Sequence, residues 1–107
     1  MSIQEITVHE LADRLRDGAQ LIDVREAHEY VEGHAPSARL IPLGEVPARL
    51  AEFPTDGEVL IICKSGGRSM RACEFVSDHG VQAVNIGGGT TAWIQAGFEI
   101  VTGDTPA

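Results

Sequence analysis

The chain has 107 residues, of which 43% are hydrophobic and 22% charged, a composition typical of one globular domain with its own core. Eight basic and sixteen acidic residues give a formal net charge of −8, which disfavours nucleic acid and anionic membrane surfaces as partners. The sequence shows no apolar run near the roughly 20 residues that span a bilayer, and no secretory signal at its start. We therefore expect a single domain over residues 1–107, located in the cytoplasm, with both cysteines reduced.

Short apolar runs alternate with amphipathic stretches along the chain, which predicts an α/β fold with a mainly parallel sheet. The first helix should be capped by Thr7 and stopped by Gly18. We expect strands near residues 5–6, 20–24, 39–41, 59–62 and 81–86, and further helices over 27–32, 43–53, 69–79 and 91–95. The run 59–62 is the most hydrophobic and should be central, whereas the tail from Gly103 has no core-forming residue and should be frayed.

Cys63 ends the central apolar run and opens a glycine-bearing loop that leads into a helix. Such a loop can point backbone N–H groups and the positive end of a helix at one sulfur, which lowers the pKa of a thiol from its usual value near ~8.5. Lys64 is the only lysine of the chain, and Arg68 lies four residues further on. We interpret Cys63 as a catalytic nucleophile. The expected substrate-binding residues are Lys64, Ser65, Gly66, Gly67, Arg68 and Ser69.

A thiolate inside an anion-binding loop suits two reactions, which are sulfur transfer through a persulfide and phosphoryl or arsenate chemistry. A tetrahedral phosphate needs a wide ring of amides that ends in an arginine, and thiol phosphatases typically place five residues between the cysteine and the arginine. Here only four residues separate Cys63 from Arg68, which favours sulfur transfer. A thiol phosphatase or arsenate reductase stays the alternative among enzymes. A persulfide-relay module with little turnover of small molecules is the alternative outside enzymes.

Several other residues have a plainer interpretation. Cys73 has the spacing of a core-facing helix residue. Residues 87–92 match a dinucleotide-binding glycine pattern, but no acidic residue lies on a following strand, so we interpret them as a tight turn with Thr90 as a helix cap. The four histidines lack metal-ligand spacing, and we expect neither a metal nor a cofactor. We interpret His34 as a turn residue and Arg71 as a helix residue that faces solvent.

Four motifs in a fixed order cover nearly the whole chain and resemble the rhodanese (sulfurtransferase) family, specifically its single-domain members. They are the Asp-Val-Arg segment at 21–26, the Gly-His-x-Pro stretch at 32–42, the cysteine loop at 63–69 and the Gly-Gly…Ala-Trp segment at 85–93. Ser37 stands where the family usually has glycine, which should affect a turn and not the chemistry.

The resemblance implies a three-layer α/β/α domain with a five-stranded, mainly parallel sheet. It implies that Cys63 takes the sulfane sulfur of a small anionic donor, such as thiosulfate, and passes it to cyanide, a thiol or a partner protein. Lys64 and Arg68 would hold the donor's anionic part, Arg25 would approach the loop with Glu29 as its ion-pair partner, and Asp23 would position the loop. The residues Ser65-Gly66 also echo the mercaptopyruvate-using branch, so the donor stays open. We expect a monomer or a weak dimer.

Overall fold

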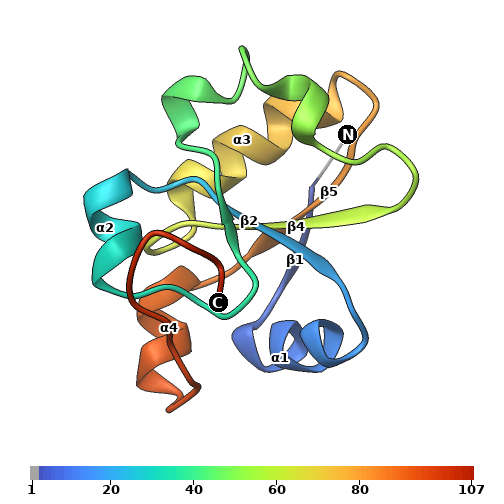
Figure 1. Ribbon diagram of the computed structural model, residues 1–107. Helices are drawn as coiled ribbons and strands as arrows, with labels where there is room; N and C mark the ends of the chain where they lie inside the picture. Colours follow the sequence, from blue (N-terminus) through green and yellow to red (C-terminus); the bar gives the residue numbers. More distant parts are fainter. Residues whose placement is uncertain (1–2) are drawn as a thin grey trace.

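The computed structural model describes residues 3–107, which form a central sheet flanked by helices (Figure 1). The strands are β1 (Gln4–Ile6), β2 (Gln20–Asp23), β3 (Arg39–Leu40), β4 (Glu58–Ile62) and β5 (Gln82–Ile86). The helices are α1 (Val8–Arg16), α2 (Ala27–Glu32), α3 (Gly67–Ser77) and α4 (Gly89–Gln95), with short 3-10 turns η1 (Leu43–Glu45) and η2 (Leu50–Glu52). Thr7 caps α1 as predicted, because its hydroxyl accepts a hydrogen bond from the Glu10 N–H at 3.2 Å.

The five strands lie in the order β1-β5-β4-β2-β3, and every pair of neighbours is parallel. This confirms the predicted five-stranded sheet and places β4 at its centre. The apolar run of β4 is buried on both faces, as a continuous Val-Leu-Ile-Ile sequence predicts for a central parallel strand.

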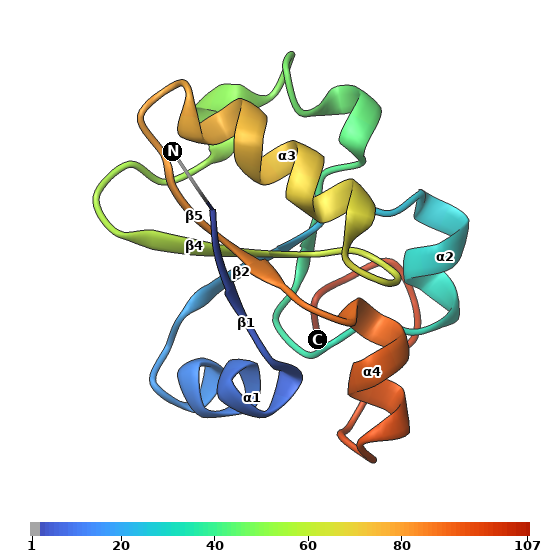
Figure 2. The ribbon, with the colours of Figure 1, turned by 180° about the vertical axis from the view of Figure 1, so that it is seen from behind.

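Helices cover both faces of the sheet, which confirms the predicted α/β architecture. In both views α3 lies on one face together with the 43–53 segment, and α1 and α4 lie on the other (Figures 1 and 2). Each face has its own hydrophobic core. One is centred on residues such as Ile61, Ala72 and Val76, and the other on residues such as Leu11, Leu60 and Trp93.

The predicted helix over 43–53 is wrong, because the segment forms only the two 3-10 turns. In an α-helix that began at Leu43, the N–H of residue 47 would bond to the Leu43 carbonyl, but Pro47 has no N–H. Arg49 pairs with Glu45 and Glu52 and so ties the two turns together.

The tail from Gly103, which the sequence predicts to be frayed, makes backbone hydrogen bonds to the rest of the fold. The Gly103 N–H donates to the Val31 carbonyl at 2.9 Å, and the Ser37 N–H donates to the Pro106 carbonyl at 3.1 Å. The buried His34 ring contacts the Thr105 carbonyl through Nε2 at 2.8 Å. Backbone hydrogen bonds hold this segment. They do not depend on apolar side chains, so the lack of core-forming residues in the tail gives no sign of them.

Ser37 adopts a φ of 71°, in the left-handed region that favours glycine. The departure from the family pattern therefore falls at a turn, as expected. None of the helices in residues 3–107 has the length and apolar character needed to cross a membrane.

Candidate active site

Cys63 follows directly on β4, and the chain turns back over its sulfur before α3 begins at Gly67. Gly66 makes this turn with a φ of 113°, a conformation that residues with a side chain rarely adopt. The Gly66 N–H donates to Cys63 Sγ at 3.1 Å, and the Ser69 hydroxyl lies 3.2 Å from the same sulfur. The loop is thus a cradle of donors around one sulfur atom.

The environment of Cys63 lowers the pKa of its thiol. Burial of Cys63 acts in the opposite direction and raises the pKa, since only 1% of the residue is exposed. Hydrogen bonds from the Ser69 hydroxyl and from the N–H groups of Ser69, Gly66 and Ser65 outweigh the burial. The arrangement favours a thiolate, the form of cysteine that acts as a nucleophile.

The first turn of α4 holds the other side of the loop. The Cys63 carbonyl accepts hydrogen bonds from the Thr90 N–H at 2.9 Å and the Thr90 hydroxyl at 3.1 Å, and the Lys64 carbonyl accepts one from the Thr91 N–H at 3.0 Å. A Cβ at Gly89 would lie 2.5 Å from the Cys63 carbonyl oxygen. The predicted role of Thr90 as a helix cap is wrong, because Gly88 is the N-cap of α4 and Thr90 binds the cysteine loop. The glycine run therefore permits close approach of two backbone segments.

Asn85 on β5 is a site residue that the sequence interpretation missed. Its side-chain amide contacts the Ser69 hydroxyl, the Gly66 carbonyl and the Glu5 carboxylate. A signal was present in the sequence, because Asn85 is a polar residue within the apolar run 83–86 and a buried amide requires hydrogen-bond partners.

Two ion pairs lie beside the loop, Arg68 with Glu29 and Arg25 with Asp23. The predicted ion pair between Arg25 and Glu29 is wrong. Glu29 instead accepts two hydrogen bonds from the Arg68 guanidinium, at 2.8 and 2.9 Å. These hydrogen bonds lower the pKa of Glu29 to about 2. Arg25 is buried and donates to the Asp23 carboxylate at 2.8 and 3.1 Å and to the Gly33 carbonyl at 2.8 Å.

The predicted site residues differ in whether their side chains are exposed to a ligand or already bound within the protein. Lys64, Ser65 and Gly67 are exposed in the loop, whereas the Arg68 side chain is held by Glu29. Asp23 accepts one backbone hydrogen bond, from the Arg25 N–H at 3.0 Å, and otherwise binds the Arg25 side chain. It therefore orients Arg25, and its hydrogen bonds do not reach the loop.

Cys73 lies on α3 and is fully buried in the core, as predicted. Burial raises the pKa of its thiol to about 12, so this second cysteine stays protonated near neutral pH. Within residues 3–107, no three histidine, cysteine or acidic side chains gather in a way that could hold a metal ion.

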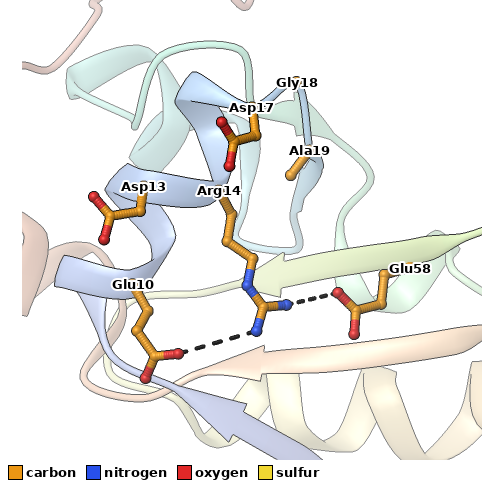
Figure 3. Close-up of a pocket in the computed structure, with 7 residues that line it drawn as sticks. All are labelled: Glu10, Asp13, Arg14, Asp17, Gly18, Ala19 and Glu58. Carbon is orange, nitrogen blue, oxygen red and sulfur yellow. Dashed lines mark hydrogen bonds and ion pairs between the residues drawn. The ribbon is translucent and has the colours of Figure 1, made fainter.

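A shallow pocket of about 530 Å³ lies at the opposite edge of the sheet, between α1 and the starts of β2 and β4. Four acidic side chains line it, and Arg14 forms ion pairs with two of them, Glu10 and Glu58 (Figure 3). Because β4 begins at this edge and Cys63 follows its other end, the pocket is separate from the cysteine loop.

Comparison with known proteins gives consistent results over most of the chain. Residues 7–96 match the Rhodanese-like domain family. A sulfurtransferase of Allochromatium vinosum is 36% identical over 102 residues, covering 92% of this chain and 95% of that protein. YtwF of Bacillus subtilis is 38% identical over 95 residues, covering 87% of this chain and 92% of that protein. The crystal structure of a rhodanese-like domain protein from Staphylococcus aureus matches with a TM-score of 0.86 at 34% identity, covering 94% of this chain and 99% of that one. The chain belongs to the rhodanese-like domain family.

Proposed function

We propose that the chain is a sulfurtransferase that carries a sulfane sulfur as a persulfide on Cys63. The observation that carries the proposal is the position of Cys63 Sγ, which lies within hydrogen-bond distance of the Gly66 N–H and the Ser69 hydroxyl in a loop that lowers its pKa. Family membership and the similarity to the sulfurtransferase of Allochromatium vinosum support the same chemistry.

The proposed reaction has two steps, with thiosulfate as the donor. The Cys63 thiolate attacks the outer sulfur of thiosulfate, the sulfur–sulfur bond of the donor breaks, and its electron pair leaves with sulfite. Cys63 then carries a persulfide with one negative charge. In the second step an acceptor such as cyanide attacks the outer sulfur, thiocyanate leaves, and the electron pair of the broken bond restores the Cys63 thiolate.

The loop residues support these steps in different ways. The N–H groups of Ser65, Gly66 and Ser69 stabilise negative charge on sulfur, and Gly66, with a φ of 113°, lets the backbone turn closely around it. Lys64 is exposed and attracts the anionic end of the donor. Arg68 takes part only indirectly while Glu29 holds its guanidinium. Arg25 forms a buried ion pair with Asp23 and binds the Gly33 carbonyl, so it fixes the chain on either side of α2.

The acceptor in the cell would be a small thiol or a partner protein, and the donor thiosulfate, mercaptopyruvate or a protein persulfide. We place the protein in the cytoplasm, because a reducing compartment keeps the Cys63 thiol available between turnovers.

Thiocyanate formation from thiosulfate and cyanide tests the proposal. The wild-type protein should form thiocyanate, and its intact mass after thiosulfate alone should rise by one sulfur atom. Cys63→Ser should abolish both signals, whereas Cys73→Ser should retain them, because Cys73 is buried in the core. Activity that survives Cys63→Ser would refute the assignment.

The two alternative functions give different results in the same experiments. A relay module would gain the sulfur from a partner cysteine desulfurase but would turn over thiosulfate poorly. A thiol phosphatase would hydrolyse an aryl phosphate faster than it forms thiocyanate.

A further inference from the structure

The Ser69 hydroxyl has a single hydrogen and three acceptors within reach. Cys63 Sγ lies 3.2 Å from Ser69 Oγ, the Gly66 carbonyl oxygen also lies at 3.2 Å, and Asn85 Oδ1 lies at 2.5 Å. Ser69 and Asn85 are 0% and 1% exposed, so water does not supply a further partner to either. The sulfur and the asparagine therefore compete for one hydrogen.

The orientation of the Asn85 amide follows from its other neighbours. Asn85 Nδ2 lies 3.2 Å from the Glu5 carboxylate and 3.2 Å from the Gly66 carbonyl, and both of these groups only accept hydrogen bonds. The NH₂ group must face them, which leaves Oδ1 facing Ser69. Asn85 is thus held as an acceptor for the Ser69 hydroxyl by contacts with β1 and with the loop.

Two arrangements of the Ser69 hydrogen follow, and the charge on Sγ selects between them. When Sγ is a thiol or the inner sulfur of a persulfide, it is a weak acceptor and the hydroxyl donates to Asn85. When Sγ is a thiolate, the charged sulfur is the stronger acceptor and the hydroxyl donates to it.

We propose that Asn85 is a positioning residue that receives the Ser69 hydrogen while Sγ is uncharged and releases it when Sγ becomes a thiolate. This inference rests on the proposed function. In the second step the bond between Sγ and the outer sulfur breaks, and its electron pair stays on Sγ. The Ser69 hydroxyl then rotates from Asn85 to the new thiolate and stabilises the leaving group without any net transfer of a proton.

Other charged or titratable groups surround Cys63, and the experiment must leave them unchanged. Arg68 and Lys64 lie in the same loop, and Cys73 lies on α3 with its pKa raised to about 12. Glu5 reaches Asn85 from β1, and Glu29 of α2 reaches the site through Arg68. The contact between Glu5 and Asn85 is lost in the two Asn85→Leu proteins, equally with and without the Ser69 hydroxyl, and the other groups are present in all four proteins of the double-mutant cycle, so these contributions cancel in the comparison.

The experiment measures the rate of Cys63 alkylation by iodoacetamide against pH, read as the mass of the Cys63 peptide, in wild type, Ser69→Ala, Asn85→Leu and the double variant. The midpoint of each profile reports the pKa of Cys63. Ser69→Ala should raise the midpoint in both backgrounds. The rise should be about 0.5–1 unit larger in the Asn85→Leu background, where the hydroxyl has lost Asn85 Oδ1, the nearest of the acceptors that compete with the sulfur. The shift in the midpoint that Ser69→Ala causes should therefore be larger without Asn85 than with it.

Equal shifts in the two backgrounds would overturn the proposal and leave Asn85 with a structural role only. Val84→Ala is the matched control on β5, because it creates a core defect away from Ser69 and should not change the effect of Ser69→Ala. Asn85→Ala removes the same acceptor and replaces the leucine variant if that variant does not fold. Alkylation requires no sulfur donor, so failure of this proposal is distinguishable from failure of sulfur transfer.

Discussion

Lys64 and Arg68 both lie next to Cys63, yet only one of them is free to meet a ligand. Lys64 is exposed, whereas the Arg68 guanidinium forms a bidentate pair with Glu29. Using Arg68 to bind a donor would cost the two hydrogen bonds to Glu29. We therefore expect Lys64 to provide the direct attraction for an anionic donor.

Lys64→Ala should raise the KM for thiosulfate about three- to tenfold with little change in kcat, because a cation at an exposed site contributes about 1 kcal/mol to binding an anion. Steady-state kinetics of thiocyanate formation measure both constants. Arg71→Ala is the control, since Arg71 is an exposed cation on the neighbouring helix. An equal rise in KM for both variants would indicate a general charge effect and contradict a specific role of Lys64.

Glu29→Gln should destabilise the fold at neutral pH by about 1–2 kcal/mol, because it breaks a partly buried ion pair. The pKa of Glu29 is lowered from 4.5 to about 2, so the carboxylate stabilises the folded state fully above pH 4.5. This contribution is lost as the pH falls through about 2. Urea unfolding against pH should show the difference between wild type and variant shrinking over that window. Glu32→Gln removes an exposed carboxylate from the same helix and is the control.

At the scale of elements, the cysteine loop is held by two helices, α3 and α4, and by the neighbouring strand β5. Gly66 caps α3, the first turn of α4 binds the carbonyls of Cys63 and Lys64, and Asn85 on β5 binds the Gly66 carbonyl. The donors around the sulfur are therefore fixed before any reactant arrives, which is the condition for electrostatic stabilisation of a reacting charge.

Gly89→Ala should disrupt this arrangement. The new Cβ would lie 2.5 Å from the Cys63 carbonyl and 2.6 Å from the Lys64 backbone, and φ is 57°. We expect a loss of about 3 kcal/mol or more in urea unfolding and a higher pKa of Cys63 in the alkylation profile.

Gly80→Ala is the matched control for that prediction. Gly80 has a φ of 88° but nothing within 4 Å of an added Cβ. It should cost only about 1 kcal/mol, and the pKa of Cys63 should not change. Similar effects of the two substitutions would show that the backbone conformation, and not the close approach at the loop, sets the cost.

At the scale of the whole molecule, the C-terminal tail closes over the segment that follows α2. In both views it runs beside α2 and the chain that leads to β3 (Figures 1 and 2). The His34 ring lies between the Tyr30 and Thr105 carbonyls, at 2.7 Å from Nδ1 and 2.8 Å from Nε2. The tail therefore provides a hydrogen-bond partner for a buried side chain.

Removal of residues 105–107 should lower the free energy of unfolding by about 1–3 kcal/mol, because one nitrogen of the buried His34 ring loses its partner. Thr105→Ala is the control, since it keeps the backbone carbonyl that His34 contacts, and it should stay within about 0.5 kcal/mol of wild type. Thermal or urea unfolding measures both. A truncated protein as stable as wild type would contradict the role of the tail.

The elements themselves could be predicted from the sequence to a large extent. Apolar runs with short turns between them predicted the parallel strands and the central position of β4, and Cys63 followed by glycines predicted the loop. These features are local, because burial of a strand and curvature of a loop depend on residues that are neighbours in the chain. Where a single proline overrode an apolar pattern, at Pro47, the local prediction was wrong.

Pairing between distant groups was decided by the tertiary structure alone. Glu29 is nearer in sequence to Arg25, but the fold brings it to Arg68, and Arg25 pairs instead with Asp23, two residues before it. Asn85 meets Ser69 only because β5 lies beside β4, and the tail meets His34 only because the chain returns past α2. Opposite charges and unpaired donors have many possible partners along a chain, and only the packed arrangement of the elements determines which of them come within hydrogen-bond distance.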